Sequence, residues 1–317
     1  MQGGEALLSR GPVRSPPTAA TSVLGVIGDP VHRSLSPVLH NAALAETGLN
    51  WVYVAFPVAA GDGHRVIDAA RVLGVVGLSV TMPHKQAVIS ELDRVSPTAR
   101  RLGSVNTVVA THGMMVGDST DGPGLIDALR SEEAWDPTGR RCVVLGTGGA
   151  ARAVTLSLAE AGAGQVIVMG RNGDASQVTA ALAGHRGRVG EIDEIGDADL
   201  VVNATPVGMS RGAGSGGAGS AHSGGAGAAP LPLTLDVTRI GAGQLVVDLI
   251  YAPAVTPLLA AAADRGARTA NGFGMLLHQA GRQFAAWTGQ TAPLQVMADA
   301  GRAELARRDQ EDRPGGG

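Results

Sequence analysis

The sequence predicts an α/β protein of two domains, and three observations carry this prediction. Short β-branched runs, such as residues 23–27 and 142–145, alternate with helical stretches, a pattern typical of parallel sheets covered by helices. The strand–helix pattern starts again near residue 140, and 317 residues exceed the roughly 100–200 of a single domain. Apolar residues form 44% of the chain, which is enough to build two cores.

In the first predicted domain, the strand at residues 23–27 ends at a Gly-Asp-Pro turn. A helix then begins at Ser36, which we expect to be the N-cap because Pro37 suits the first helical position. Gly48 ends this helix. The next elements are expected to be a strand at 52–56, a helix at 64–73 and a strand at 75–80.

The second predicted domain repeats the pattern after a bridging helix at 125–130. Its strands are expected at 140–145, 165–169, 200–203 and 245–249, and the chain returns to the first domain through a helix at 275–287. We therefore expect a first domain of residues 22–122 plus 271–306 and a second of 123–270. Three segments have a loose composition, and we expect them to lack a core: a leader (1–21), a Gly/Ala/Ser insertion (210–229) and a tail (307–317).

Charge and composition exclude several classes of protein. Lys and Arg number 25 against 28 Asp and Glu, and only 3% of residues are aromatic, so nucleic acid is not an expected partner. No apolar run approaches the ~20 residues that span a bilayer. The single cysteine, Cys142, excludes a cysteine metal cage, and the eight histidines lack ligand spacing. We expect a cytoplasmic monomer or homodimer that acts on a small molecule without a metal.

A glycine-rich segment indicates a dinucleotide site. Gly146, Gly148 and Ala151 fit the G-x-G-x-x-G/A pattern directly after a strand and at the start of a helix. Gly146 allows a tight turn, Gly148 lets the backbone approach a pyrophosphate, and Ala151 permits close helix packing. A tight turn without a ligand fits the same residues. No carboxylate follows the next strand, but Arg171 does, which favours NADP because a guanidinium suits a 2′-phosphate. An ordinary solvated arginine would also fit this loop.

Polar residues in the first domain are candidates for binding and catalysis. Ser34 and Ser36 precede a helix, where two hydroxyls suit a small carboxylate, although a plain helix cap explains them equally. Lys85 follows a strand end, where it would act as a proton donor or be a solvated cation. Asn106 and Asp121 lie in loops, and a lysine and an aspartate facing one hydroxyl would make a proton-transfer pair.

Together these segments resemble the shikimate/quinate dehydrogenase family over about residues 22–300. The matching segments run in the family's order: Gly28-Asp29-Pro30 with Ser34-Leu35-Ser36-Pro37, Ser79-Val80-Thr81-Met82-Pro83-His84-Lys85, Gly103-Ser104-Val105-Asn106-Thr107, Asp118-Ser119-Thr120-Asp121-Gly122, Gly146-Thr147-Gly148-Gly149-Ala150-Ala151-Arg152, Asn203-Ala204-Thr205-Pro206, Asp248-Leu249-Ile250-Tyr251 and Asn271-Gly272-Phe273-Gly274-Met275-Leu276-Leu277-His278-Gln279.

The resemblance implies a substrate domain and a Rossmann-like NADP domain with a cleft between them. It also implies a role for each matching residue: catalysis for Lys85 and Asp121; substrate binding for Ser34, Ser36, Thr81, Asn106, Tyr251 and Gln279; and cofactor binding for Gly146, Gly148, Gly149, Ala150, Ala151, Arg171, Asn203, Thr205, Gly272 and Met275.

The implied reaction is the reversible, NADPH-dependent reduction of 3-dehydroshikimate to shikimate, in the biosynthesis of chorismate and the aromatic amino acids. Two alternatives remain: a quinate/shikimate dehydrogenase with relaxed substrate and NAD(P) use, and a non-catalytic nucleotide-binding protein on the same fold. The sequence departs from the family pattern at Arg33 (usually His) and at Ser79 (usually Asn). It also has Gly170-Arg171-Asn172 where Asn-Arg-Thr/Ser is usual, Ala175 where a further basic residue is often found, and the Gly/Ala/Ser insertion.

Overall fold

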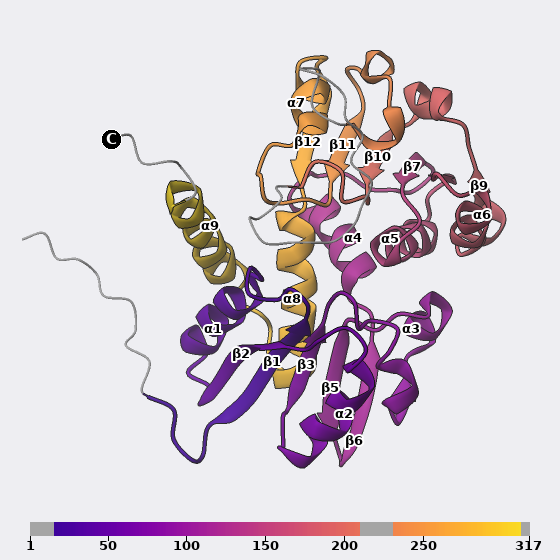
Figure 1. The fold of residues 1–317 in the computed structure, drawn as a ribbon. Helices are drawn as coiled ribbons and strands as arrows, with labels where there is room; N and C mark the ends of the chain where they lie inside the picture. The colour runs from indigo at the N-terminus through magenta and orange to yellow at the C-terminus, as the bar shows by residue number, and fades with distance from the viewer. Residues whose placement is uncertain (1–15, 210–230, 312–317) are drawn as a thin grey trace, which may run out of the picture. The chain divides into compact units, whose positions relative to one another are not determined.

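The computed structural model describes residues 16–209 and 231–311, which form two α/β units (Figure 1). The first unit contains residues 16–93, 108–116 and 284–311, and the second contains residues 94–107, 117–209 and 231–283. The predicted α/β class is confirmed. The functional domain limits of 22–122 plus 271–306 and 123–270 stay a prediction. The predicted insertion at 210–229 lies outside the described residues.

The first sheet has the strand order β2-β1-β3-β5-β6-β4. The central strand β1 runs parallel to β2 and β3, so the predicted strands at 23–27, 52–56 and 75–80 are neighbours. The carboxyl ends of β1 and β3 therefore lie at one edge of the sheet. The strand bounds are β1 (Ser22–Gly28), β2 (Trp51–Pro57), β3 (Gly77–Val80), β4 (Arg94–Val95), β5 (Thr107–Thr111) and β6 (Met114–Asp118).

Helix α1 packs against α9 in the first unit, and it buries the aliphatic face that includes Leu39, Ala43 and Leu44. Apolar positions at this spacing lie on one side of a helix, which makes burial of that side favourable. Helices α2 and α8 also contribute residues to this unit, and most of α8 belongs to the second unit. The bounds are α1 (Ser36–Glu46), α2 (Gly63–Val72), η1 (Ile89–Glu91), α8 (Phe273–Thr288) and α9 (Leu294–Glu311).

Three local expectations for this unit need correction. Leu35, not Ser36, is the N-cap of α1, and the Ser34 hydroxyl accepts a hydrogen bond from the Ser36 amide at 3.2 Å. Residues 307–311 of the expected tail are helical, because α9 continues to Glu311 with ion pairs at i,i+3 and i,i+4 spacing. In residues 18–21 of the expected leader, Thr18 pairs with Thr21, and Asn50 hydrogen-bonds to Ala20 and Thr21. Residues 1–15 and 312–317 lie outside the described part.

The second sheet is parallel throughout, with the strand order β12-β11-β10-β7-β8-β9. Its first strand in the chain, β7, lies in the middle between β10 and β8. This is the order of a doubly wound Rossmann sheet, whose ligands bind where the strand order reverses. The strands are β7 (Arg141–Leu145), β8 (Gln165–Met169), β9 (Gly187–Val189), β10 (Leu200–Asn203), β11 (Leu245–Asp248) and β12 (Arg268–Asn271).

Helices cover both faces of the second sheet. Alternate residues of β7 enter separate cores: Val144 packs with α4 and α5, and Val143 packs with α7. Strands buried on both faces are apolar throughout, which explains the continuous runs in the sequence. The helices are α3 (Pro97–Leu102), α4 (Asp121–Ser131), α5 (Gly149–Glu160), α6 (Gly173–Ala181), η2 (Gly184–Arg186), η3 (Ile192–Asp197), η4 (Pro232–Thr234), η5 (Val237–Arg239) and α7 (Pro257–Ala263). Within the described residues, no helix is both long and apolar enough to cross a membrane.

Candidate active site

The glycine-rich loop between β7 and α5 has the conformation that an anion site requires. Gly146 has φ +113°, a conformation that a side chain would strain. Gly148 is the N-cap of α5, no side chain caps this end of the helix, and a Cβ on Gly148 would meet no atom within 4 Å. The first amides of α5 are thus left without a side-chain partner beside open space. A pyrophosphate would accept hydrogen bonds from them, and the helix dipole would favour its charge.

Asn203 and Thr205 lie beside this loop, at the end of β10. A Cβ on Gly146 would meet the Ala204 carbonyl oxygen at 3.1 Å and Thr205 Cγ2 at 3.2 Å, so the two loops are in close contact. Asn203 Oδ1 accepts hydrogen bonds from the Thr205 amide at 3.0 Å and its hydroxyl at 2.7 Å. Both predicted residues therefore line the edge where the strand order reverses.

The buried carboxyl of Asp248 holds the Asn203 side chain in place. The Asn203 carboxamide donates to Asp248 Oδ1 at 3.0 Å, and the Thr256 hydroxyl donates to Asp248 Oδ2 at 2.7 Å. Burial raises the pKa of Asp248, although these hydrogen bonds partly oppose the shift. The motif that begins at Asp248 thus contributes a residue that orients Asn203, which sequence reasoning did not assign.

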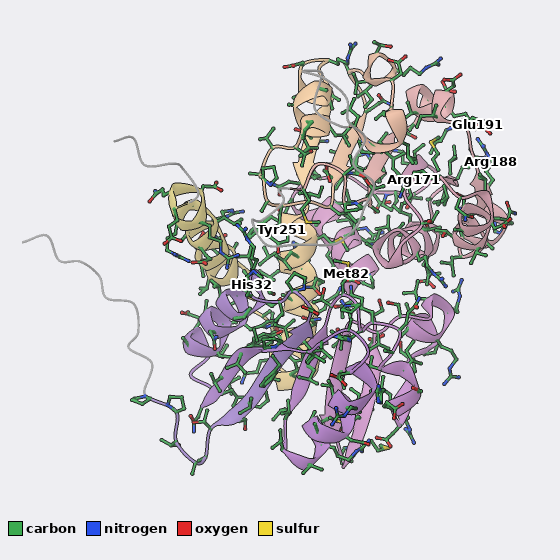
Figure 2. The ribbon with its side chains drawn as sticks, viewed as in Figure 1. His32, Met82, Arg171, Arg188, Glu191 and Tyr251 are labelled. Atoms are coloured by element: carbon green, nitrogen blue, oxygen red, sulfur yellow. The ribbon has the colours of Figure 1, made fainter. Side chains whose placement is uncertain are left out.

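Arg171 is exposed in the loop between β8 and α6 (Figure 2). The loop conformation depends on its neighbours: a Cβ on Gly170 would come within 2.6 Å of Ser176 and of Thr147. Asn172 caps α6 by accepting a hydrogen bond from the Ala175 amide at 2.9 Å. A side chain at position 170 would therefore require Ser176 and Thr147 to shift. Another nearby arginine, Arg188 on β9, is paired with Glu194.

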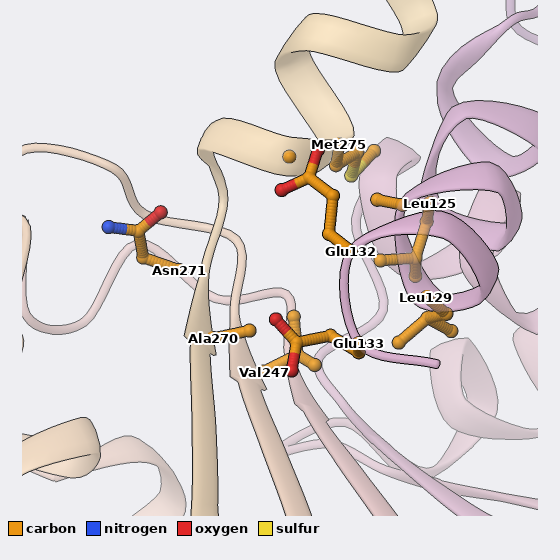
Figure 3. Close-up of a pocket in the computed structure, with 10 residues that line it drawn as sticks. Leu125, Leu129, Glu132, Glu133, Val247, Ala270, Asn271 and Met275 are labelled. Carbon is orange, nitrogen blue, oxygen red and sulfur yellow. The ribbon is translucent and has the colours of Figure 1, made fainter. Parts of the chain in front are cut away.

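Gly272, Met275 and Tyr251 follow the last two strands of this sheet. A Cβ on Gly272 would lie 2.0 Å from the Leu249 carbonyl oxygen, so only glycine fits there. Met275 lines a crevice between α4 and the strands β11 and β12 (Figure 3). Two carboxylates on this crevice are already paired: Glu132 with His278 and Glu133 with Arg268, each at 3.1 Å. Both carboxylates of the crevice thus have a side-chain partner.

Asn106, Asp121 and Gln279 form one buried cluster in the second unit. The Asn106 carboxamide nitrogen lies 2.8 Å from Asp121 Oδ1 and 3.1 Å from Gln279 Oε1. Its oxygen accepts hydrogen bonds from the Thr120 amide at 2.8 Å and the Thr107 hydroxyl at 2.8 Å. Each of the three predicted residues is at most 8% exposed. A buried polar network with these partners holds side chains in one orientation.

Thr107, Thr120 and Gln283 were not assigned from the sequence. Gln283 donates to the Thr107 hydroxyl at 3.1 Å, one helical turn beyond Gln279 on α8. The i,i+4 spacing of the two glutamines was the available signal, because it places both on one face of a helix.

The predicted substrate residues of the first unit follow the ends of β1 and β3. Ser34 and Ser36 lie at the start of α1, and Ser36 is buried. The Thr81 amide donates to the Ile27 carbonyl at 3.0 Å, so Thr81 continues the pairing of β3 with β1. His84 is buried and its Nε2 lies 2.8 Å from the Val58 carbonyl, which anchors the turn before the half-buried Lys85.

The structure thus brings together Asn106, Asp121 and Gln279, and separately Gly146 with Asn203 and Thr205. Lys85 belongs to the first unit and Asp121 to the second, so their pairing stays a prediction. No group of three potential metal ligands occurs in the described part of the chain. The second unit has a Rossmann sheet with an uncapped, glycine-rich helix start, and the first unit has polar residues at its strand ends. This combination is typical of a dinucleotide-dependent oxidoreductase.

Known proteins identify the family. Residues 26–108 match the shikimate dehydrogenase substrate binding domain, and residues 272–300 match the shikimate 5′-dehydrogenase C-terminal domain. Over 300 residues, 91% of this chain and 97% of the relative, it is 44% identical to the shikimate dehydrogenase (NADP(+)) of Geobacter sp. strain M21. The chain belongs to the shikimate dehydrogenase family, whose members are NADP-dependent oxidoreductases acting on a CH–OH group.

Solved structures agree with this assignment. A shikimate dehydrogenase crystallised in complex with NADP+ has a TM-score of 0.82 at 34% identity, covering 93% of this chain and 99% of that one. A quinate dehydrogenase from Corynebacterium glutamicum in complex with NAD has a TM-score of 0.76 at 31% identity, covering 89% and 99%. The predicted family and fold are confirmed.

Proposed function

We propose that this protein catalyses the reversible NADPH-dependent reduction of 3-dehydroshikimate to shikimate. The observation that carries the proposal is the buried cluster of Asn106, Asp121 and Gln279. Asn106 lies 15 positions from Asp121 and 173 from Gln279 in the sequence, yet it hydrogen-bonds to both. The family resemblance assigns each of them to the substrate or to catalysis. Identity to NADP-dependent shikimate dehydrogenases over most of the chain supports the same reaction.

Lys85 is the proposed proton donor. NADPH, when bound, would supply a hydride to the carbonyl carbon of the substrate. Negative charge then develops on the carbonyl oxygen, where the Lys85 ammonium stabilises it and transfers a proton to form the hydroxyl. In the reverse direction, the neutral amine accepts the same proton. Asp121 is the second catalytic residue, and its carboxylate accepts a hydrogen bond from a ring hydroxyl.

Other polar side chains are proposed to hold the rest of the substrate. Ser34 and Ser36 donate hydrogen bonds to the carboxylate, with the N-terminus of the eleven-residue helix α1 favouring its charge. Thr81, Asn106, Tyr251 and Gln279 are proposed to surround the ring and its hydroxyls. Such positioning lowers the entropic cost of bringing the reacting atoms together.

The residues of the second unit fit NADP. The uncapped start of α5 and the open space at Gly148 suit the pyrophosphate, held by Gly146, Gly148, Gly149, Ala150 and Ala151. Arg171 suits the 2′-phosphate. Asn203 and Thr205 lie at the β10 edge along which the cofactor would run, with Gly272 and Met275 proposed near the nicotinamide.

The reaction is tested by following absorbance at 340 nm with 3-dehydroshikimate and NADPH, and then with shikimate or quinate and either NADP or NAD. Turnover of shikimate with NADP, and little of quinate, supports the proposal. Comparable turnover of quinate with NAD would assign the protein to the broader quinate/shikimate class. No turnover with folded protein would support the non-catalytic alternative.

Quinate/shikimate activity with relaxed cofactor use is the second candidate. Arg171 is followed by Ala175 instead of a further basic residue, and a quinate dehydrogenase solved with NAD shares this fold at 31% identity. A cytoplasmic location, and a monomer or homodimer, stay expectations from the sequence.

A further inference from the structure

Asp248 is a fully buried carboxyl at the end of β11, and the proposed mechanism does not use it. Its Oδ1 accepts hydrogen bonds from the Asn203 carboxamide at 3.0 Å and from the Ile250 amide at 3.1 Å. Its Oδ2 accepts one from the hydroxyl of Thr256, the N-cap of α7, at 2.7 Å. One carboxyl therefore joins the end of β10, the turn after β11 and the start of α7.

Each of the three partners of Asp248 gives a hydrogen to the carboxyl. A carboxamide nitrogen and a backbone amide can only donate, so Oδ1 receives two hydrogens. The Thr256 hydroxyl accepts from the Leu259 amide at 3.3 Å and gives its own proton to Oδ2. The ionised carboxylate accepts at both oxygens, so this form matches all three donors. Burial raises the pKa of Asp248, and these three hydrogen bonds oppose that shift.

The carboxylate decides which way the Asn203 amide faces. The Asn203 nitrogen is directed to Asp248, and its oxygen accepts from the Thr205 amide at 3.0 Å and the Thr205 hydroxyl at 2.7 Å. In a flipped Asn203, the nitrogen would meet the Thr205 amide, so two donors would face each other. The Thr205 hydroxyl in turn accepts from the Val207 amide at 3.3 Å. The shape of the turn of residues 203–208 therefore depends on Asp248.

This turn packs against the glycine-rich loop on one side and the start of α7 on the other. A Cβ added at Gly146 would meet Thr205 Cγ2 at 3.2 Å. A Cβ added at Gly208 would meet Thr256 Cβ at 3.5 Å. A change in the shape of the turn would therefore alter the surface beside the proposed pyrophosphate site.

Strand order indicates which half of the cofactor the turn would meet. Strands β8 and β10 flank β7 on opposite sides. In a Rossmann sheet, the adenosine ribose lies at the end of the strand that follows the glycine-rich helix, which here is β8, before Arg171. The dinucleotide crosses the point where the strand order reverses, so the turn after β10 would lie beside its nicotinamide half.

We propose that Asp248 is a positioning residue for the nicotinamide half of the cofactor, which acts by fixing the Asn203 carboxamide and the turn that follows it. Because Asp248 is fully buried, it acts through Asn203 and not by contact with the cofactor. The inference rests on the proposed cofactor site and adds Asp248 and Thr256 to it.

Calorimetry on the full chain tests this with two probes, NADP+ and adenosine 2′,5′-bisphosphate, which lacks the nicotinamide half. Asp248→Asn keeps the size of the side chain but replaces one acceptor oxygen by an amide nitrogen, so one of its three donors loses its acceptor. We expect a rise of about tenfold in the Kd for NADP+ and less than about twofold in that for the bisphosphate. Thr256→Val, which removes the donor to Oδ2, should have the same pattern.

A double variant gives a rescue. Asp248→Asn combined with Thr256→Asp moves the carboxylate to the N-cap of α7, where aspartate is a favoured residue. The amide at position 248 can then donate to position 256 and still accept from Asn203 and Ile250. We expect the Kd for NADP+ to return to within about threefold of that of the intact chain. A double variant that binds as weakly as Asp248→Asn would contradict the role of this hydrogen-bond pattern.

Gln244→Met separates the effect from a general loss of stability. Gln244 is buried beside the opposite end of β11. Its side chain is hydrogen-bonded to the Gly241 amide and the Ile195 and Ala198 carbonyls at 2.8–2.9 Å. The thermal midpoint should fall in Gln244→Met as in Asp248→Asn, but the Kd for NADP+ should stay unchanged. An equal rise in Kd in both variants would mean that Asp248 acts on stability alone, and would overturn the inference.

The remaining outcomes separate this inference from the proposed function. An unchanged Kd for NADP+ in Asp248→Asn and Thr256→Val would overturn the role of Asp248 and leave the proposed cofactor site intact. An equal loss of bisphosphate binding would contradict an action through the turn after β10. If the intact chain bound neither probe, the proposed cofactor site would be wrong, and the inference with it.

Discussion

Lys85 is the only lysine in the 317 residues, since every other member of the Lys and Arg total is an arginine. The two side chains are not equivalent in acid–base chemistry. A guanidinium stays protonated in proteins, whereas an ammonium can give up its proton when its surroundings assist. A proton donor at this position therefore requires lysine, and composition alone makes Lys85 distinct in this chain.

Replacing Lys85 by alanine should lower kcat about 10²- to 10⁴-fold with a small change in KM, because the ammonium acts mainly in the transition state. Lys85→Arg should also be poorly active, since the guanidinium keeps its proton. The measurement is steady-state kinetics at 340 nm, with exposed Arg65→Ala as the matched control. Because Lys85 carries the only ε-amine, an amine-specific reagent should inactivate the enzyme, and shikimate with NADP should slow this. Unchanged kcat in Lys85→Ala would reject its assigned role.

At the scale of elements, the turn from β8 to α6 is closely packed at Gly170. Gly170 has no space for a side chain, and Asn172 is used as the cap of α6. Arg171 is the cationic residue of this turn, and it is exposed.

Arg171→Ala should raise KM for NADPH by about tenfold while leaving KM for NADH nearly unchanged, because only NADPH carries the 2′-phosphate. Initial rates measured with NADPH and with NADH give the two KM values. Arg130→Ala, an exposed arginine of α4 in the same unit, serves as the control. Equal losses with both cofactors would mean that Arg171 does not recognise the phosphate.

Helix α9 gives a second prediction at this scale. Glu304 lies between Arg307 and Arg308, whose hydrogen bonds lower the pKa of its carboxyl from 4.5 to about 2. Arg308 in turn donates to the Arg33 carbonyl at 2.6 Å, which ties the helix end to the loop before Ser34. The ordered end of α9 thus supports the loop of the proposed carboxylate site.

A carboxyl with a lowered pKa in the folded state contributes stability above its unfolded pKa and loses it as pH falls through the folded value. Glu304→Gln should therefore lower the thermal midpoint by about 2 °C at pH 7, and the difference should shrink between pH 4.5 and 2. Scanning calorimetry across this range measures it. Asp299→Asn, an exposed carboxyl of the same helix, is the control. A constant difference at all pH values would exclude the ion pairs as its cause.

At the scale of the molecule, the proposed residues are divided between the two units. Ser34, Ser36, Thr81 and Lys85 belong to the first, whereas Asp121 and the cofactor residues belong to the second. A ligand that binds only the folded chain stabilises it by mass action, to an extent of about 2.7 kcal/mol at a hundredfold excess over Kd.

NADP and shikimate should each raise the thermal midpoint, and together they should raise it more than either does alone. Differential scanning fluorimetry measures these shifts. Lys85→Ala should retain them, because it removes a proton donor and leaves the proposed binding residues in place, while Ser36→Ala should lose most of the shift from shikimate. No shift with NADP in the intact chain would contradict the proposed cofactor site.

Local sequence determined much of the second unit. The strands at 165–169 and 200–203 were predicted with the observed bounds, because a strand buried on both faces of a parallel sheet is a nearly continuous apolar run. The turn at Gly146 and the start of α5 were predictable for a similar reason: they depend on backbone conformation, which adjacent residues control.

The predicted start of α1 and the predicted end of α9 were wrong in detail. Serine is a common N-cap, but Leu35 takes that place, and Ser36 is the buried first residue of α1. Residues after Arg308 have a loose composition, yet α9 continues to Glu311, which forms an ion pair with Arg307. Packing and ion pairs from other turns decided both ends, and propensity at a single position does not contain them.

The sequence alone determined the family, the α/β class and which residue types were available for chemistry, because motifs and periodicity are properties of neighbouring residues. Only the tertiary structure decided which of them meet. Asn106 contacts Gln279 across 173 positions, and Tyr53 reaches Ser79 across 26. These contacts depend on strand order and helix packing, which arise from burying the whole chain at once, and no local pattern specifies them.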